Sequence, residues 1–412
     1  MTAGTTAPVA VTGLGLLTPA GDGTDATWDG VRRGLGTAAH DPALHGLPVD
    51  FSCRVPLSSE ELGRRIGRAA WRMARNSGLA VLAAREAVLD AGLDPGSWDG
   101  DRVAVVLGCG LGADAEREAQ AVRLRESGPE AVSALTSALV LSNMASGEVS
   151  IDLGARGPVL APNTACASGG SALAVARDLL AAGRCDIAVA GATEAAVTPL
   201  VCAGFWRAGA LSRRTGTPVG ASRPFAADRD GFVLAEGAGV LVLERTGDAA
   251  ARGARVRALL VGCGSTADAH HPTAPAPGAR GAEAALRTAL SDAGLAPHDV
   301  DHVNAHGTST PLGDAGEAAL IARVLPHRPS VTAPKGVLGH GLGAAGAIEA
   351  ALTVLTLQHR TVPPIANLGA PAPEFGLDCV SKEPRRQDVR VAVSHSFGFG
   401  GHNVVLALAR AS

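Results

Sequence analysis

The chain has 412 residues, of which 46% are hydrophobic, and its formal net charge is −3. This length is enough for a large core and for two or three domain-sized units. The small net charge and the 3% aromatic content, with no tyrosine, argue against nucleic acid as a partner. No apolar run reaches membrane-spanning length, and the first residues lack the basic start of a signal peptide. We therefore expect a cytoplasmic protein that does not act at a membrane.

Seven cysteines are present, an odd number, and none of them form a Cys-x-x-Cys spacing. This pattern is unlike a disulfide framework or a zinc module, for which paired and closely spaced cysteines are typical. The sequence thus predicts reduced thiols and no metal site.

Short apolar runs alternate with alanine- and leucine-rich runs along the whole chain. We predict strands, in chain order, at 9–15, 102–110, 186–195, 238–245, 257–266, 302–307, 330–335, 390–396 and 402–410. We predict helices at 64–92, 167–182, 280–294, 314–324 and 342–358. Several strands are continuously apolar, which is typical of strands buried on both faces. The alternation predicts an α/β protein with covered sheets.

Glycines mark the ends of three of these helices. Gly92, Gly183 and Gly294 stand where a left-handed C-terminal cap favours glycine. The order of elements before and after about residue 255 is similar, although sequence identity between the two parts is not evident. We therefore predict two duplicated halves, residues 1–254 and 255–412.

Cys166 lies in the segment "NTACASGG", where an apolar run gives way to a helical one. At a helix N-terminus a thiol pKa can fall from ~8.5 toward ~7, which would favour a nucleophilic thiolate. A small buried cysteine that fills a tight turn is the alternative interpretation.

Two histidines occupy similar strand-to-helix transitions. His306 lies in "NAHGTSTPLGD" and His340 in "APKGVLGHGLGAAGAIEA". Singly, each is more typical of a structural or surface histidine. Such transitions in α/β sheets converge on one crevice, so we expect both rings to lie near Cys166. The glycine-rich run in "SHSFGFGGHN" either offers backbone N–H groups as an oxyanion hole or forms a tight turn.

Five ordered motifs carry a resemblance to a known family. They are "NTACASGG", "RPFAADRDGFVLAEGAGVLVLE", "VNAHGTSTPLGD", "PKGVLGHGLGAAGAIE" and "SFGFGGHN". Together they resemble the β-ketoacyl-acyl carrier protein synthases of the thiolase superfamily, in particular the elongating type of fatty-acid synthesis and its type II polyketide relatives. The resemblance covers essentially the whole chain. It implies a five-layered αβαβα fold, a dimer, and a catalytic set of Cys166, His306 and His340.

The resemblance also implies a reaction. Cys166 takes an acyl chain from an acidic acyl carrier protein, and a malonyl group on a second carrier loses its carboxylate to give an enolate. His306 and His340 donate hydrogen bonds from Nε2 to the enolate oxygen, and the N–H groups of Cys166 and Phe399 hold the tetrahedral oxyanion. No cofactor or metal is implied, because the substrates travel on the carrier's phosphopantetheine.

Further residues follow from the same motifs. Lys335 is implied to support catalysis through an ion pair with Glu349 or Glu317, since an unpaired buried charge would be costly. Phe399 is implied to be a gate, and the 268–277 loop a second one. Gly398 and Gly400 are expected to act as hinges of the first gate.

Substrate contacts are implied at Leu111, at the bottom of the acyl pocket, and at Thr308 and Thr310. The chain departs from the family pattern at His395, where asparagine is usual, and at Gly341, where a larger residue is common. We expect His395 to alter the hydrogen bonds behind the gate and Gly341 to widen the site.

Carrier docking is predicted from arginines. Arg64, Arg68 and Arg72 recur every four residues, which would place them on one face of the helix predicted at 64–92. Arg207 begins a second basic cluster with Arg213 and Arg214. These side chains suit an acidic carrier protein, although an ordinary solvated helix face would look the same.

Two other functions compete with this prediction. A non-catalytic subunit resembling a chain-length factor would shape the pocket of a partner ketosynthase, but such subunits replace the cysteine that Cys166 supplies here. A catalytic chain still pairs either with itself or with such a subunit. A dinucleotide-binding reductase would use Gly13 and Gly15, but the third glycine of that fingerprint is missing.

Overall fold

Two runs of strands build the centre of the molecule in the computed structural model, which describes residues 7–369 and 371–411. The first run consists of β1 (Val9–Thr18), β5 (Val103–Gly108), β6 (Val159–Leu160), β7 (Ile187–Glu194) and β8 (Gly237–Arg245). The second consists of β9 (Ala258–Ala267), β10 (His302–Asn304), β11 (Ser330–Thr332), β13 (Asp378–Cys379), β15 (Val391–Gly398) and β16 (His402–Arg410). All nine strands predicted from the sequence are present. Short strands are β2 (Gly21–Asp22), β3 (Ala39–His40), β4 (Phe51–Ser52), β12 (Thr361–Val362) and β14 (Arg385–Arg386).

The two runs repeat one pairing pattern. β1 pairs antiparallel with β8, β8 antiparallel with β7, and β7 parallel with β5, which continues parallel to β6. In the same way β9 pairs antiparallel with β16, β16 antiparallel with β15, and β15 parallel with β10, which continues parallel to β11. A short antiparallel contact between β1 and β9 joins the runs. The predicted duplication with mixed sheets is thus confirmed.

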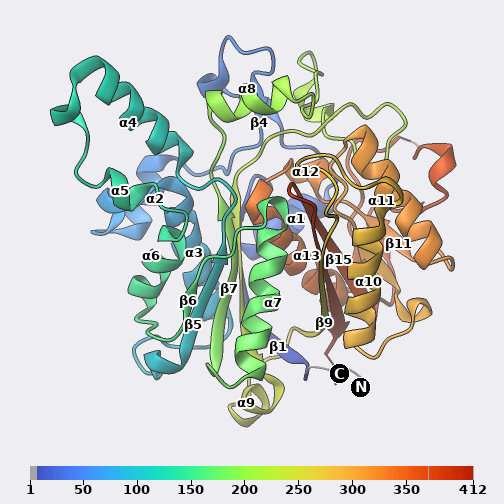
Figure 1. Ribbon diagram of the computed structural model, residues 1–412. Helices are drawn as coiled ribbons and strands as arrows, with labels where there is room; N and C mark the ends of the chain where they lie inside the picture. The colour runs from blue at the N-terminus through green and yellow to red at the C-terminus, as the bar shows by residue number, and fades with distance from the viewer. Residues whose placement is uncertain (1–6, 370, 412) are drawn as a thin grey trace.

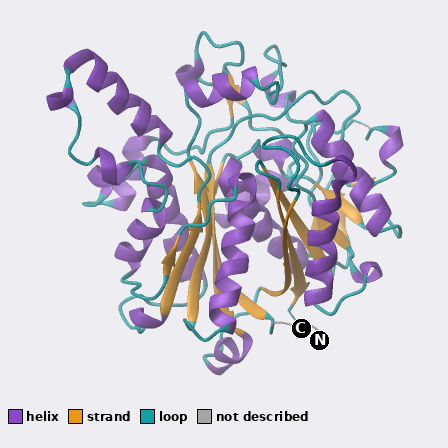
Figure 2. Cartoon of the chain, viewed as in Figure 1, coloured by secondary structure: helices purple, strands orange, loops and turns teal. Residues whose placement is uncertain are grey.

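Helices cover both runs of strands and also separate them (Figures 1 and 2). Between the strands lie α7 (Ser168–Ala181) and α13 (Ala345–His359), which contact strands of both runs. α3 (Arg75–Asp90) and α6 (Met144–Leu153) form one outer layer, and α10 (Arg280–Asp292) and α11 (Pro311–Val324) form the other. This order of layers confirms the predicted αβαβα architecture.

The described residues form seven more α-helices: α1 (Thr24–Arg32), α2 (Ser59–Ile66), α4 (Asp114–Ser127), α5 (Thr136–Leu139), α8 (Pro199–Arg207), α9 (Thr246–Ala251) and α12 (Lys335–Leu338). Residues of α7 and α13 share one hydrophobic core, so the two halves are packed as one body. A division of the chain at residue 254 stays a prediction.

Glycine pairs let each outer helix approach its sheet closely. A Cβ built on Gly13 or Gly15 in β1 would clash with backbone oxygens of α3, and one on Gly262 or Gly264 in β9 would clash with backbone oxygens of α10. Gly13 and Gly15 therefore lie inside a strand and not in a phosphate-binding turn. This placement removes the basis of the dinucleotide interpretation.

The predicted helix at 64–92 is wrong. α2 ends at Ile66 because Gly67 has φ +85° and ψ −144°, a conformation that cannot continue a helix. A short 3₁₀ turn follows at Ala70–Arg72 before α3 begins at Arg75. Arg64, Arg68 and Arg72 therefore do not share one helical face.

The other helix boundaries agree with the prediction. Gly92, Gly183 and Gly294 each have φ +66° at the C-terminal end of a helix, as expected for left-handed caps. Within residues 7–369 and 371–411, no helix combines the length and the apolar character that a membrane crossing requires.

Candidate active site

Cys166 stands in a tight turn directly before α7. Ala165, the preceding residue, has φ +51°, an uncommon conformation for a residue with a side chain, and residues Ala165–Ala167 form a 3₁₀ turn. The hydroxyl of Ser168 fixes this turn: it accepts from the N–H of Thr164 at 2.9 Å and donates to the carbonyl of Ala165 at 2.7 Å. The turn presents a part-buried thiol at the helix start.

Two backbone N–H groups approach the Cys166 sulfur. The N–H of Cys166 itself and that of Phe399 lie close enough to the sulfur to act on the thiol, and both lower its pKa. Phe399 comes this close because the preceding residue is Gly398, where a Cβ would clash with the carbonyl of Thr164. The two donors expected to form an oxyanion hole therefore lie together at the thiol.

The predicted effect on the thiol pKa has the wrong sign. Burial of the Cys166 thiol raises its pKa to about 12, although the positive charge of Lys335 and the two N–H donors act in the opposite direction. The negative charge of Glu194 raises the pKa further. Loss of hydration around the sulfur thus outweighs the helix terminus on which the prediction depended.

A thiol with this pKa should react faster at every higher pH. Below its pKa the thiolate fraction grows about tenfold per pH unit, so alkylation of Cys166 by iodoacetamide should rise from about pH 6 to about pH 10 without a plateau. Peptide mapping by mass spectrometry measures the rate at this cysteine alone. A plateau near pH 8 would contradict the expectation and indicate a pKa near 7.

His306 and His340 face each other beside this turn. Their ring centroids are 5.5 Å apart and nearly perpendicular, and both side chains are buried. His306 follows β10 and His340 follows α12, whereas Cys166 precedes α7, so three distant segments supply the site. Burial holds both imidazole pKa values well below the usual range, and the charge of Lys335 lowers them further. Both rings are thus neutral at physiological pH.

Lys335 fixes the proton of His306. Its Nζ donates to the carbonyl of His306 at 2.6 Å, lies 3.3 Å from Nδ1 of the same ring, and forms a buried ion pair with Glu349. Since an ammonium group has only donors, Nδ1 must accept and the ring proton resides on Nε2. The Nε2–H of His306 is therefore a hydrogen-bond donor.

Glu317 holds the His306 turn from the other side. Its carboxylate accepts from the N–H groups of His306 and Gly307, each at 2.8 Å. His395 lies 2.9 Å away through Nδ1 and is fully buried. The sequence placed His395 behind the gate but did not reveal this contact, because no local pattern links residues 78 positions apart.

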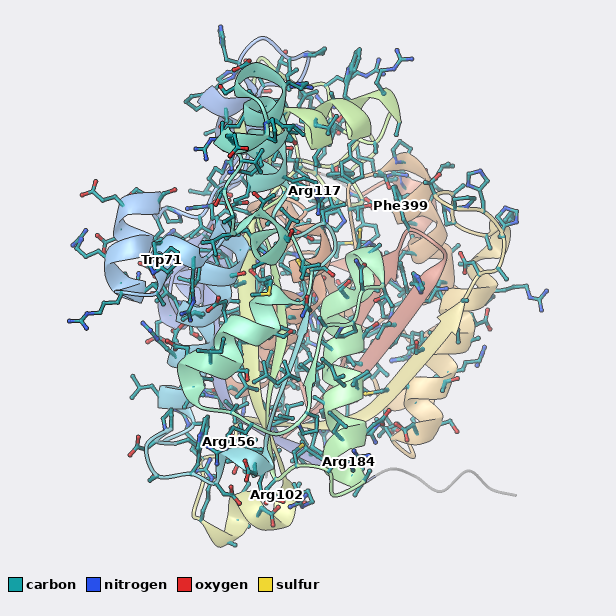
Figure 3. All side chains as sticks on the ribbon, turned by 60° about the vertical axis from the view of Figure 1, so that its left-hand side comes forward. Trp71, Arg102, Arg117, Arg156, Arg184 and Phe399 are labelled. Carbon is teal, nitrogen blue, oxygen red and sulfur yellow. The ribbon has the colours of Figure 1, made fainter. Side chains whose placement is uncertain are left out.

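Phe399, the residue predicted to be a gate, directly follows β15 and lies in the upper right part of Figure 3. Phe399 is 38% exposed, and its ring centroid is 6.1 Å from that of Phe205 in α8. The next residue, Gly400, has φ +83° and donates its N–H to the carbonyl of Pro272 at 2.7 Å. The two loops expected to be gates are thus hydrogen-bonded to each other. Gly398 allows close packing, whereas Gly400 has a positive φ that favours glycine.

Leu111 lies in a turn that a buried carboxylate organises. Glu194, at the end of β7, accepts from the N–H groups of Gly110, Leu111 and Gly112 and from that of Gly343 near His340. The Leu111 side chain is 38% exposed in the single chain, so it does not close the bottom of a pocket by itself. Glu194 is absent from the residues predicted from the sequence, although a carboxylate at the end of an apolar strand is a signal that could have indicated it.

Thr308 and Thr310 lie close to His306, but their hydroxyl groups hydrogen-bond each other. Their hydroxyls are 3.0 Å apart, and that of Thr310 accepts from the N–H of Gly313 as the N-terminal cap of α11. Structural roles therefore account for both hydroxyls.

The arginines predicted for docking are dispersed. Arg64 pairs with Glu61 on α2, and Arg72 forms a bidentate pair with the buried Glu148, with Nη2 at 2.9 Å. The guanidinium carbon of Arg207 lies 6.0 Å from the ring centroid of Trp206. Arg207 is two residues beyond Phe205, whose ring lies beside that of Phe399. Trp71, the neighbour of Arg72, is well separated from Phe399 in Figure 3. Arg207 is therefore near the gate, and Arg72 is part of a structural ion pair.

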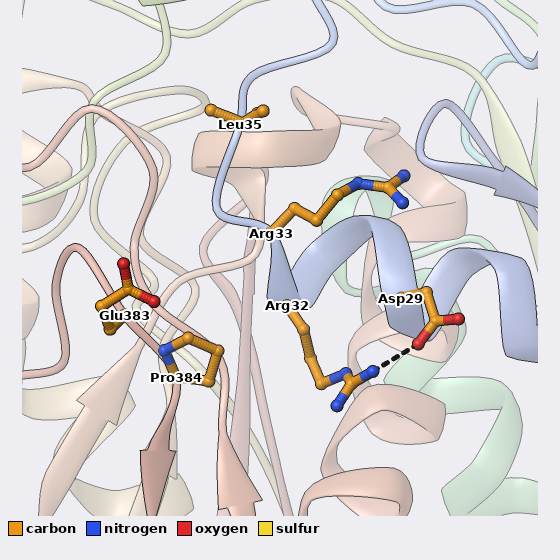
Figure 4. Close-up of a pocket in the computed structure, with 6 residues that line it drawn as sticks. All are labelled: Asp29, Arg32, Arg33, Leu35, Glu383 and Pro384. Atoms are coloured by element: carbon orange, nitrogen blue, oxygen red, sulfur yellow. Dashed lines mark hydrogen bonds and ion pairs between the residues drawn. The ribbon is translucent and has the colours of Figure 1, made fainter.

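A surface groove beside the end of α1 is separate from this site. It is lined by Asp29, Arg32, Arg33, Leu35, Glu383 and Pro384 (Figure 4). Its lining includes neither the cysteine nor the histidines described above, and Arg32 is engaged with Asp29 at 2.5 Å. The groove contributes no group to the chemistry at Cys166.

Comparisons with known proteins agree with this geometry. Residues 6–249 match the family model of the Beta-ketoacyl synthase, N-terminal domain, and residues 257–369 match that of the C-terminal domain. The chain is 43% identical over 411 residues to a 3-oxoacyl-[acyl-carrier-protein] synthase 2 of Synechocystis sp., with 97% of each chain covered. It is 40% identical over 402 residues to the synthase of the same name from Staphylococcus aureus, again with 97% of each covered.

Solved structures give the same result. The ishigamide ketosynthase/chain length factor superposes with a TM-score of 0.92 at 32% identity, covering 98% of this chain and 100% of that one. A type II polyketide ketosynthase in complex with its acyl-carrier protein superposes with a TM-score of 0.91 at 30% identity and the same coverage. Two family models that together span most of the chain, and full-length relatives above 30% identity, establish that this chain belongs to the beta-ketoacyl synthase family.

Proposed function

We propose that this chain condenses an acyl group held on Cys166 with a malonyl group held on an acyl carrier protein, with loss of carbon dioxide. The product is a β-ketoacyl chain on the carrier, in fatty-acid or type II polyketide synthesis. The observation that carries the proposal is the meeting of one thiol, two backbone N–H donors and two neutral imidazoles in one buried place. The curated relatives, named 3-oxoacyl-[acyl-carrier-protein] synthase 2, support the same reaction.

The first half-reaction is acyl transfer. The Cys166 sulfur attacks the thioester carbonyl. The N–H groups of Cys166 and Phe399 donate hydrogen bonds to the negatively charged oxygen of the tetrahedral intermediate. The carrier's sulfur leaves and takes up the proton that the Cys166 thiol loses. Because the thiol pKa lies near 12, the attack depends on a thiolate formed only as the substrate arrives.

The second half-reaction is decarboxylative condensation. The malonyl group loses carbon dioxide, and the electron pair of the broken bond forms an enolate whose oxygen receives a hydrogen bond from the Nε2–H of His306. His340 lies beside it as a neutral ring that can act in the same way. The enolate carbon then attacks the acyl carbonyl, a carbon–carbon bond forms, and the sulfur of Cys166 leaves. No cofactor or metal takes part in this proposal.

The alternative role as a non-catalytic chain-length factor has less support. A subunit that only shapes a partner's pocket has no need of a thiol with two aimed N–H groups, nor of Lys335 holding a proton on His306. The complete set of reacting groups favours catalysis.

We propose an acidic acyl carrier protein as the cytoplasmic partner, docked near Arg207 beside the gate. We also propose a dimer, with a second copy or with a subunit like a chain-length factor. The exposed apolar side chains around edge strand β6 support it: Leu111, Leu141, Ile151, Val159 and Leu160. An uncovered apolar sheet edge in a folded protein usually belongs to an interface.

The test is reconstitution with purified carrier thioesters. We expect intact-mass analysis to show one acyl group on Cys166 after incubation with acyl carrier protein loaded with a straight chain. Addition of malonyl carrier should then release carbon dioxide and give a β-ketoacyl carrier. A chain that forms no acyl adduct with any carrier substrate, and no condensed product, would overturn the proposal.

A further inference from the structure

Gly341 directly follows His340 and is buried, yet the fold does not require a glycine there. Its φ of −79° and ψ of 25° are accessible to any residue. Apart from its chain neighbours His340 and Leu342, a Cβ built at Gly341 would come within 4 Å only of the Cβ of Ala344, at 3.8 Å, which is an ordinary contact. A buried backbone position that is neither strained nor crowded by distant parts of the chain has room for a side chain larger than that of glycine.

The neighbouring glycines show the contrast. Gly339 has φ +69°, and its Cβ would lie 2.8 Å from the sulfur of Cys53. At Gly343 a Cβ would clash with the N–H of Gly110, and at Gly346 it would lie 2.7 Å from the hydroxyl of Ser396. Packing or backbone conformation explains these three glycines but does not explain Gly341.

The room for a side chain at position 341 lies close to the proposed reaction centre. The 3₁₀ turn Leu342–Ala344 that follows Gly341 packs against the turn that carries Cys166. The Glu194 carboxylate ties Gly343 to the turn around Leu111, so the walls on both sides are held in place. Position 341 therefore lies between His340 and a turn that contacts the Cys166 turn, close to where the first carbons of a chain attached to Cys166 would lie.

We propose that Gly341 determines specificity by widening the acyl site beside His340, so that acyl chains branched near the thioester carbonyl are accepted on Cys166. This inference depends on the proposed function, because it concerns what Cys166 takes up. A side chain at position 341 would fill the space that the branch occupies. One methylene more or less in such a pocket changes discrimination by roughly 10- to 200-fold.

The experiment compares two chains with the same number of carbons, 2-methylbutanoyl and pentanoyl, on acyl carrier protein. The rate at which each acyl group loads onto Cys166 is followed by intact mass for the unchanged protein, for Gly341→Leu and for Gly341→Ala. We expect Gly341→Leu to slow loading of the branched acyl group at least about tenfold relative to the straight one. The effect of Gly341→Ala should lie between those of the unchanged protein and Gly341→Leu.

Gly247→Leu is the matched control. Gly247 lies in α9, where a Cβ meets no atom within 4 Å, and α9 is at the opposite end of the molecule from α12 and α8 (Figure 1). This variant should leave the ratio of branched to straight loading unchanged. Thermal unfolding of Gly341→Leu confirms its fold, and Gly341→Ala answers the question by itself if the larger side chain impairs folding.

The outcomes separate the two proposals. Equal slowing of both chains by Gly341→Leu, or no slowing of either, would overturn the role of Gly341 while the acyl adduct itself still supports the proposed function. If the natural chain loads neither acyl group, the proposed function fails, and the specificity inference fails with it.

Discussion

Cys166→Ala should abolish acyl loading, with no acyl adduct by intact mass and a condensation rate lower by at least about a thousandfold. The reason is that the two N–H donors lie at the Cys166 sulfur, which forms the acyl thioester in the proposed reaction. Release of carbon dioxide from malonyl carrier should persist, because the imidazoles that receive the enolate remain. Loading is measured by mass and decarboxylation by trapped carbon dioxide, on the same preparation.

Cys379→Ala provides the control for this variant. Cys379 is part-buried like Cys166 but lies in β13, at the far edge of the sheet. It should load and condense at the natural rate. Acyl adducts that persist in Cys166→Ala would show that another nucleophile carries the chain, and the assignment would then be wrong.

His340→Ala should give the opposite pattern. The acyl group should still load on Cys166, whereas decarboxylation and condensation should fall by about 10²- to 10³-fold, the usual cost of one lost oxyanion donor. The ring of His340 packs edge-on against Phe232 at 5.2 Å, so thermal unfolding must show that the variant remains folded. Single-turnover loading and carbon dioxide release measure the two steps separately.

His359→Ala is the corresponding control. This histidine ends α13, whose other end lies near His340, and it stacks on Trp28 at 5.4 Å. Its loss should leave both steps intact. A natural yield of carbon dioxide from His340→Ala would remove this ring from the reaction, and a loss of loading would show that it serves the first step instead.

Strands could be predicted from the sequence because burial on both faces makes them continuously apolar. β1, β5 and β8 are buried along nearly their whole length, and each was identified within a few residues. α4 was not identified, because it projects from the body and only Asp114 among its residues is buried. A helix with so little buried surface shows no apolar stripe.

The candidate site residues could be located from the sequence, but their pKa shifts could not. Motif order placed Cys166, His306 and His340, and the structure brings them together. The pKa of the Cys166 thiol is raised, whereas the prediction was that the helix N-terminus lowers it. The prediction failed because burial depends on how the whole protein packs and not on the helix start alone. Glu194 and the contact between Glu317 and His395 depend on side chains that meet only after folding.

The backbone and the side chain of Phe399 make contacts in different directions. Its amide reaches the reactive sulfur, whereas its ring extends toward Phe205 and solvent. If Phe399 is the predicted gate, a substitution there changes the size of the entrance but keeps the backbone N–H, which every amino acid except proline possesses. In the proposed reaction, the choice of substrate could therefore change by substitution at Phe399 while the N–H stays at the sulfur, provided that Gly398 still allows the close approach.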